Sequence, residues 1–296
     1  MINWINAARL RTLPLSLSGI VVGSFVAYKQ GFWDTSIFVL ALLTTLFLQV
    51  LSNFANDLGD SYKGADNTAR VGPQRAIQSG KITQRQMILG VTLMALLSLA
   101  TAIPLILIGT SEMSIHVLWT YILLAFLCVG AAITYTIGKK AYGYHGWGDV
   151  MVFIFFGCVS VLGVYTLYSK QFDWSLLFFA ICIGLLSIAV LNLNNMRDYE
   201  NDKAVGKKTI VVKMGFRRAK LYQTSLIVGA LVGLLLFIGL KTWWWSLIAL
   251  IPFVFLLQHL IVVWKTTEPR LLDPELKKVA LSTFLIAILF SISTMI

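Results

Sequence analysis

Nine long apolar stretches divide this chain, and they constrain its fold more than any other feature. Each is close to the length of about 20 mostly apolar residues that an α-helix needs to cross a bilayer. They occupy residues 12–28, 33–56, 86–109, 114–136, 149–168, 174–196, 219–240, 243–264 and 277–295. Inside a bilayer the backbone polar groups of a helix are satisfied within the helix itself. The pattern therefore predicts an all-α, polytopic membrane protein with about nine transmembrane helices.

The hydrophilic links between these stretches are short and leave no room for a soluble domain. The longest are 57–85 and 197–218. We expect one membrane-embedded domain over residues 1–296, with two pseudo-repeats at roughly 1–140 and 141–264 and a final helix. Residues 2–11 are expected to form a short helix that lies in the headgroup region.

Basic residues gather on one side of the predicted membrane. If the N-terminus is cytoplasmic, all but three of the 24 lysines and arginines fall in cytoplasmic segments, and the exceptions are Lys29, Lys170 and Lys241. This distribution follows the positive-inside rule, so it predicts the N-terminus inside and the C-terminus outside. It also explains the net charge of +11 without nucleic acid as a partner.

A first polar cluster ends the second apolar stretch. Asn53, Asn56, Asp57 and Asp60 follow the spacing i, i+3, i+4, i+7, which places their side chains on one face of a helix. Hard oxygen ligands thus gather where the helix is expected to leave the membrane.

A second cluster ends the sixth stretch and repeats this arrangement. Asn194, Asp198 and Asp202 are spaced i, i+4, i+8, with Asn195 and Arg197 between them. Four crossings separate the two clusters, so both are predicted on the same face of the membrane. Ordinary solvated loops are the alternative, but six of the thirteen acidic residues lie in these two segments, which favours a functional site.

Carboxylate and amide oxygens without His or Cys favour Mg²⁺, which binds one or two carboxylates together with substrate phosphates. Lys63 and several other cations lie on the same side; the positive-inside bias explains most of them, whereas Arg75, Lys139 and Arg197 adjoin a motif. A diphosphate at the interface with an apolar tail in the bundle indicates a polyprenyl diphosphate as substrate.

The link after the fourth stretch is rich in aromatic residues, including Tyr135 and Tyr142. Two explanations stay open for them. They are either part of an interfacial aromatic belt, or they shield an allylic cation and stack on an aromatic acceptor.

Several short motifs also follow one another in order along nearly the whole chain. They are Ala8-Arg9-Leu10-Arg11-Thr12-Leu13-Pro14; Asn56-Asp57-x-x-Asp60 with Lys63-Gly64-x-Asp66; Gly72-Pro73-x-Arg75; Tyr135-x-x-x-Lys139; Gly148-Asp149; and Asn195-x-Arg197-Asp198-x-x-x-Asp202 with Gly206-Lys207-x-Thr209. With this ordered set the chain resembles the UbiA superfamily of intramembrane aromatic prenyltransferases, and within it the 1,4-dihydroxy-2-naphthoate polyprenyltransferases of menaquinone synthesis.

The resemblance implies a bundle of nine helices around a central cavity that opens to the cytoplasmic side of a bacterial inner membrane. It implies Mg²⁺-dependent transfer of a polyprenyl chain to 1,4-dihydroxy-2-naphthoate, an aromatic acid, with loss of CO₂. The expected catalytic and metal-binding residues are Asp57, Asp60, Asp198 and Asp202. The expected substrate-binding residues are Asn53, Asn56, Lys63, Arg75, Tyr135, Lys139, Tyr142, Asn195 and Arg197.

The chain departs from the superfamily pattern in two places. Five residues, not three, separate Asp60 from Asp66, which argues against Asp66 as a ligand. The Thr and Pro-Gln that follow the lysines in the 4-hydroxybenzoate branch are absent after Lys139-Lys140, which argues against that acceptor.

Three alternatives remain. One is a prenyltransferase of the same superfamily with another aromatic acceptor. Another is a secondary transporter, although such proteins generally place their polar sites in broken helices near the midplane, and the spans here look uninterrupted. The third is a CDP-alcohol phosphotransferase, whose Asp-Gly-x-x-Ala-Arg sequence is missing because Ser61 follows Asp60. The sequence leaves the prenyl chain length and the oligomeric state open.

Overall fold

The computed structural model of the protein describes residues 2–65, 71–72 and 74–296, and these residues form helices and loops without any β-strand. Nine helical segments within them are long and apolar enough to cross a membrane, which confirms the predicted fold class. The long helices are α2 (Leu13–Lys29), α3 (Thr35–Tyr62), α4 (Gln84–Gly109), α5 (Ile115–Thr134), α8 (Leu176–Arg197), α11 (Phe216–Lys241), α12 (Phe253–Lys265) and α13 (Asp273–Thr294).

Shorter helices complete the spans and the links. The fifth span consists of α6 (Gly148–Val152), the π-helix η3 (Phe153–Gly163) and α7 (Val164–Ser169). The 3₁₀ helices are η1 (Leu10–Thr12), η2 (Tyr142–Tyr144), η4 (Trp244–Leu250) and η5 (Pro269–Leu272). The remaining short helices are α1 (Ile2–Ala8), α9 (Tyr199–Ala204) and α10 (Ile210–Met214).

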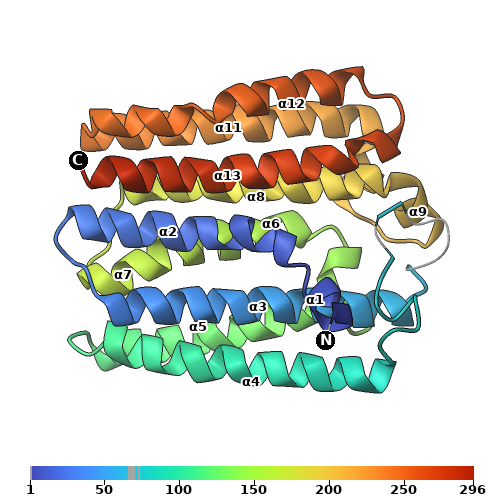
Figure 1. Cartoon of the computed structure of the whole chain (residues 1–296), viewed down its shortest axis with the longest axis horizontal. Coiled ribbons are helices and arrows are strands. Elements are labelled where there is room, and N and C mark those ends of the chain that lie inside the picture. The colour runs from blue at the N-terminus through green and yellow to red at the C-terminus, as the bar shows by residue number, and fades with distance from the viewer. Residues whose placement is uncertain (1, 66–70, 73) are drawn as a thin grey trace.

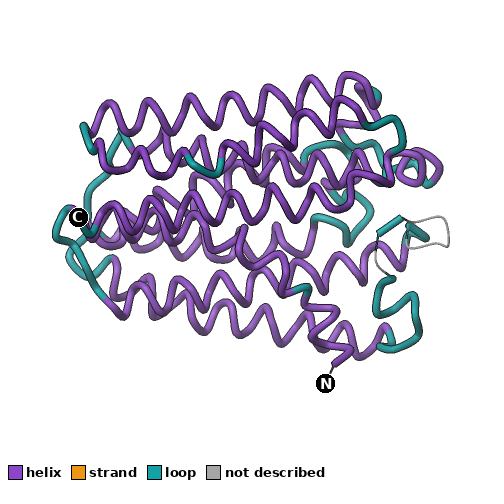
Figure 2. The backbone as a smooth tube through the Cα atoms, turned by 45° about the horizontal axis from the view of Figure 1, so that its top comes forward, coloured by secondary structure: helices purple, strands orange, loops and turns teal. Residues whose placement is uncertain are grey.

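The long helices run roughly side by side along the molecule (Figure 1). In this view α11 and α12 lie at one edge, α13 and α8 follow, α2 lies next to them, and α3, α5 and α4 form the opposite edge. Loops gather at the two ends of the bundle (Figure 2). The end that carries α1 and α9 also carries the two polar clusters.

Polar side chains begin two of the spans. The Asp34 carboxylate accepts hydrogen bonds from the backbone N–H groups of Ser36 and Ile37 and starts α3. Thr83 and Gln86 form a capping box that starts α4. These side chains satisfy backbone N–H groups that have no partner within the helix.

Not every span is a regular α-helix, contrary to the impression from the sequence. Residues Phe153–Gly163 form a π-helix in the fifth span. The eighth span starts as the 3₁₀ helix η4 and becomes α12 only after Pro252, which lacks the N–H group that a continuous helix would use. Both departures depend on local geometry that hydropathy does not encode.

Glycines allow the fifth span to pack closely on both sides. A side chain on Gly23 of α2 would lie 2.5 Å from the Val161 carbonyl oxygen of η3, and one on Gly157 would lie 2.7 Å from the Ala180 carbonyl oxygen of α8. Small residues let membrane helices approach to this distance. The fifth span is therefore held between α2 and α8, where it forms one wall of the interior.

Candidate active site

A cavity of about 1020 Å³ lies inside the bundle and extends from the two polar clusters into the apolar interior. Helices α2, α3, α4, α5 and η3 supply half of the residues in its wall, which is largely aliphatic and aromatic. The polar end is lined by Arg9, Asn53, Asn56, Asp57, Asp60, Arg75, Tyr135, Tyr142, Asn194, Arg197 and Lys207. The cavity therefore joins a charged mouth to an apolar body.

Asp57 lies at this mouth and has two arginine partners. Arg75 Nη1 lies 2.8 Å from Asp57 Oδ1, and Arg9 forms an ion pair with the same oxygen. The Asp57 side chain itself is only 1% exposed. Two cations thus neutralise one buried carboxylate, as a buried charge requires.

Asp60 lies one helical turn further along α3 and has a different partner. The Tyr144 hydroxyl donates a hydrogen bond of 2.7 Å to Asp60 Oδ1, and Arg75 Nη2 lies 3.9 Å from its Oδ2. The Tyr144 ring also has Lys63 Nζ at 4.0 Å and Lys207 Nζ at 5.2 Å from its centroid. These are cation–π distances, so Tyr144 connects Asp60 to two basic residues.

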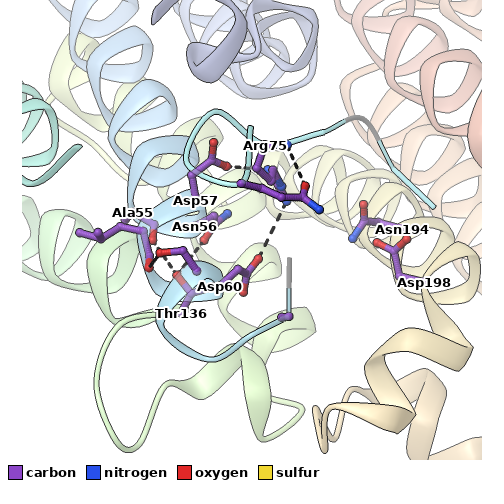
Figure 3. Close-up of polar contacts among 12 residues, drawn as sticks. Ala55, Asn56, Asp57, Asp60, Arg75, Thr136, Asn194 and Asp198 are labelled. Atoms are coloured by element: carbon purple, nitrogen blue, oxygen red, sulfur yellow. Dashed lines mark hydrogen bonds and ion pairs between the residues drawn. The ribbon is translucent and has the colours of Figure 1, made fainter. Parts of the chain in front are cut away.

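The asparagines of the first cluster are anchored by neighbouring segments. Asn53 Nδ2 donates to the Ala8 carbonyl oxygen at 2.8 Å. The Thr136 hydroxyl shares its single hydrogen between the Ala55 carbonyl oxygen at 2.9 Å and Asn56 Oδ1 at 3.3 Å (Figure 3). The last two turns of α3 are thereby fixed against the N-terminal segment and the loop after α5.

Arg197 organises the second cluster. Its guanidinium binds both oxygens of Asp198, with Nε–Oδ1 and Nη2–Oδ2 distances of 2.9 and 2.7 Å. It also donates to Asn194 Oδ1 at 2.8 Å and to Asp273 Oδ1 at 2.7 Å. Asp202 lies further along, with its Oδ1 3.7 Å from Lys207 Nζ.

The two clusters face each other, as predicted. Figure 3 shows Asp57, Asp60 and Arg75 on one side and Asn194 and Asp198 on the other. Hydrogen bonds join the surrounding segments, among them one of 3.1 Å from Asn201 Nδ2 to the Ala65 carbonyl oxygen and one of 3.0 Å from the Lys208 N–H to the Tyr144 carbonyl oxygen.

Burial and neighbouring charges determine the protonation states of two cavity residues, Lys207 and Tyr135. Burial disfavours the charged form of Lys207, but Asp60 and Asp202 outweigh burial and raise the pKa of Lys207 above its usual range. Burial raises the pKa of Tyr135 to about 12, against the opposing effect of Lys207. Lys207 is therefore an ammonium and Tyr135 a neutral phenol at physiological pH. Burial lowers the pKa of Lys63, partly offset by Asp60.

Tyr135 and Tyr142 pack against each other with their ring centroids 5.2 Å apart in an edge-to-face arrangement, and both line the cavity. The Tyr142 hydroxyl donates to the Ala131 carbonyl oxygen at 2.9 Å. Two rings thus border the charged mouth where the apolar wall begins.

The predicted site residues divide into three groups. Asn53, Asn56, Asp57, Asp60, Arg75, Tyr135, Tyr142 and Arg197 line the cavity. Asp198, Asp202 and Lys63 do not line the cavity. Asp198 and Asp202 lie next to Arg197 and Lys207 of the wall, and Lys63 lies against Tyr144, whose hydroxyl contacts Asp60. Lys139 is exposed outside the cavity, and Asn195 is buried, its Oδ1 without a hydrogen-bond partner among the described residues. Asp66 lies outside the described residues.

Four further residues belong to the site, although the sequence did not single them out. Arg9 and Lys207 fall within the motifs quoted above, and Tyr144 falls within the aromatic link after the fourth stretch, whereas Asp273 lies outside these segments. Asp273 begins α13 and meets Arg197 across 76 residues of sequence. Charged residues at the ends of apolar stretches are the signal that could have drawn attention to Arg9 and Asp273.

The donor set is suited to a divalent cation that also binds phosphate. Among the described residues no three His, Cys, Asp or Glu side chains converge on one point. Each cluster instead offers two aspartates, with asparagines nearby. Mg²⁺ binds one or two protein carboxylates and takes its other ligands from water and phosphate oxygens, so the residues fit this ion.

The sequence and the fold match known proteins over most of the chain. A model of the UbiA prenyltransferase family matches residues 16–292. The chain is 40% identical to a 1,4-dihydroxy-2-naphthoate octaprenyltransferase of Haemophilus influenzae, over 99% of this chain and 96% of that protein. It is 37% identical to the protein of the same name from Escherichia coli, over 97% of this chain and 93% of that protein.

Solved structures show the same fold. A UbiA homolog from Archaeoglobus fulgidus bound to GPP and Mg²⁺ aligns with a TM-score of 0.65 at 18% identity, over 97% of this chain and 98% of that one. The apo structure of a UbiA homolog from Aeropyrum pernix aligns with a TM-score of 0.70 at 14% identity, over 96% and 98%. These matches favour a prenyltransferase over a transporter or a CDP-alcohol phosphotransferase. The chain therefore belongs to the UbiA prenyltransferase family, as a multi-pass membrane protein with two facing Asp-rich clusters above an apolar cavity.

Proposed function

We propose that this protein transfers a polyprenyl chain from an allylic diphosphate to 1,4-dihydroxy-2-naphthoate with loss of CO₂. The observation that carries the proposal is the junction of the charged mouth with the apolar cavity. The mouth suits a diphosphate and the cavity suits an isoprenoid chain. The names of the relatives at 40% and 37% identity support the naphthoate as acceptor.

Asp57 and Asp60 on one side and Asp198 and Asp202 on the other would hold Mg²⁺ in this proposal. The ion supplies positive charge that stabilises the leaving diphosphate. The homolog bound to GPP and Mg²⁺ supports a divalent ion in this family.

Basic side chains of the mouth bind the diphosphate itself. Arg9, Arg75, Arg197 and Lys207 all line the cavity. Arginine can bind phosphate oxygens through two parallel hydrogen bonds. Positive charge that is already in place where negative charge develops lowers the barrier to breaking the C–O bond. Both electrons of that bond leave with the diphosphate.

The apolar wall and the two tyrosine rings act on the organic part of the reaction. The wall excludes water from the allylic cation. The faces of Tyr135 and Tyr142 stabilise it by cation–π contact or stack on the acceptor. The electron-rich ring attacks the cation, and the carboxylate leaves as CO₂ while its bonding electrons remain with the ring.

We further propose that the protein lies in the bacterial inner membrane, with this mouth on the cytoplasmic side. The basic residues at the mouth support this orientation through the positive-inside rule. Another aromatic acceptor in place of the naphthoate is the second candidate function, since the residue chemistry alone suits any electron-rich phenolic ring.

A product assay on the purified, detergent-solubilised protein tests the function. It contains 1,4-dihydroxy-2-naphthoate, a polyprenyl diphosphate and Mg²⁺, with EDTA in a parallel sample. We expect a prenylated, decarboxylated naphthoquinol that EDTA abolishes. Release of diphosphate without this product would point to a different acceptor, and product formation in EDTA would refute the metal requirement.

A further inference from the structure

Two amide side chains on α3 share one hydroxyl inside the cavity. Gln49 Nε2 lies 3.0 Å from Thr12 Oγ1, and Asn53 Nδ2 lies 3.3 Å from the same oxygen. Thr12 belongs to η1 and is itself part of the cavity wall, as are Gln49 and Asn53. This group lies on the apolar side of Asp57, one to two turns deeper along the helix.

The hydrogen bonds fix how both amides are oriented. Thr12 Oγ1 donates its only hydrogen to the Arg9 carbonyl oxygen at 2.9 Å, so towards the two amides it can only accept. Their nitrogens must therefore face Thr12. Asn53 Nδ2 directs its second hydrogen to the Ala8 carbonyl oxygen.

Among the described residues no hydrogen bond reaches the carbonyl oxygens Gln49 Oε1 and Asn53 Oδ1, and both residues line the cavity. The two residues are one turn apart on a continuous helix, a rise of about 6 Å.

We propose that Gln49 and Asn53 form a subsite that binds the phenolic hydroxyls of the aromatic acceptor, with Thr12 as the positioning residue. The inference rests on the proposed function and deepens it, because it assigns the acceptor to one place in the cavity. It also assigns Asn53 to the acceptor instead of the metal ions.

The chemistry of the proposed substrates singles out the hydroxyls. An isoprenoid chain has no hydrogen-bond donor, so it would leave both carbonyl oxygens unsatisfied at a cost. A diphosphate presents acceptor oxygens and would be repelled by two further carbonyl oxygens. Of the isoprenoid chain, the diphosphate and the aromatic acceptor, only the acceptor has strong hydrogen-bond donors, its phenolic O–H groups. A ring bound by Gln49 and Asn53 would lie just below the charged mouth, where the allylic cation forms.

Equilibrium binding under anaerobic conditions tests the subsite without turnover. The probes are 1,4-dihydroxy-2-naphthoate and its 1,4-dimethoxy analogue, which keeps the ring and carboxylate but lacks both donors. We expect wild-type protein to bind the dihydroxy compound at least about tenfold more tightly, as one or two hydrogen bonds provide. Gln49→Leu should lose most of this preference, and so should Gln49→Met, which conserves volume.

Gln171→Leu is the matched control, since Gln171 is exposed in the loop between α7 and α8. It should keep the full preference. Thr12→Val should weaken binding of the dihydroxy compound, and Thr12→Ser should restore it because serine keeps the hydroxyl. In steady-state assays the Gln49 variants should raise the KM for the naphthoate and leave the KM for the prenyl diphosphate unchanged.

The outcomes separate this inference from the proposed function. Equal binding of the two probes by wild-type protein, or an unchanged preference in Gln49→Leu, overturns the subsite even if the protein makes the expected product. If wild-type protein makes no naphthoquinol but prefers another dihydroxylated ring to its dimethyl ether, and Gln49→Leu abolishes that preference, the naphthoate is wrong and the subsite stands.

Discussion

The four aspartates of the two clusters have different partners. Substituting them one at a time therefore tests a different contact in each variant. Asp57 has two arginines, Asp60 a tyrosine and an arginine, Asp198 a two-point contact with Arg197, and Asp202 a lysine. Asparagine has almost the same shape as aspartate but carries no charge. Each change to asparagine therefore removes a charge and leaves the packing in place.

Asp57→Asn or Asp198→Asn is expected to abolish turnover, a loss of at least about a hundredfold, because each removes a carboxylate that the proposal assigns to the metal ions. The protein should still insert and elute as a folded species in detergent. Product formation and size-exclusion profiles would be measured in parallel. Glu112→Gln, on an exposed residue between α4 and α5, is the control and should keep full activity. Full activity in either aspartate variant would contradict the assignment.

Tyr144→Phe tests whether the hydroxyl orients Asp60. The change deletes the hydrogen bond to Asp60 Oδ1 and keeps the ring next to Lys63 and Lys207. A hydrogen bond to a charged group contributes about 2 kcal/mol, so kcat/KM should fall about 30-fold. Tyr62→Phe, on a tyrosine that is 54% exposed, should have no effect. An unchanged kcat/KM in Tyr144→Phe would show that Asp60 needs no such partner.

At the residue scale the sequence predicted which acidic residues form the site, but it did not predict which residues they contact. The spacing of Asn53, Asn56, Asp57 and Asp60 is local, so helical periodicity alone places them on one face. Arg9 and Tyr144 meet the same cluster from 48 and 84 residues away in the chain. No local pattern encodes such contacts, because they depend on how the helices pack.

The helices themselves were predictable because length and hydropathy determine whether a segment spans a membrane. All nine predicted stretches coincide with helical spans of the described structure, with ends that differ by several residues. The π-helix in the fifth span and the 3₁₀ start of the eighth were not predictable in this way. Hydropathy reports neither the π-helix nor the 3₁₀ geometry that ends at Pro252.

Gly23→Ala is expected to destabilise the contact between α2 and the fifth span. Its new methyl group would lie 2.5 Å from the backbone oxygen of Val161, so the helices must separate. The apparent Tm in detergent should fall by several degrees. Gly130→Ala in α5 provides the control, since nothing lies within 4 Å of the added methyl group. It should leave Tm unchanged or raise it slightly, because alanine favours the helix by about 1 kcal/mol over glycine. Equal Tm values for the two variants would argue against the close contact.

Across the whole molecule, charge is distributed unequally between the two ends of the bundle. Figure 1 shows α1 and α9 at one end of the bundle and the α2–α3 and α7–α8 loops at the other. Both polar clusters lie at the first of these ends. The predicted orientation follows from this asymmetry together with the positive-inside rule. It stays a prediction until the sidedness is measured.

Single cysteines at exposed positions report the sidedness in intact cells. Lys203→Cys, in α9, should react with a membrane-impermeant maleimide only after the cells are opened. Gln171→Cys should react in intact cells, provided that any outer membrane has been made permeable to the maleimide. The native cysteines Cys128, Cys158 and Cys182 lie within spans, so the unsubstituted protein is the background control. The opposite labelling pattern would reverse the orientation.

The ion pairs at the mouth have a consequence for the order in which ligands bind. Asp57, Asp198 and Asp202 are all paired with the protein's own cations. A metal ion arriving alone would leave an arginine or lysine without its counter-charge, and a diphosphate arriving alone would do the same to an aspartate. When both arrive together, each takes one member of a pair, and the total charge stays balanced. In the proposed function, each ligand takes the counter-charge that the other one releases, so we expect Mg²⁺ and diphosphate to tighten each other's binding by the same factor.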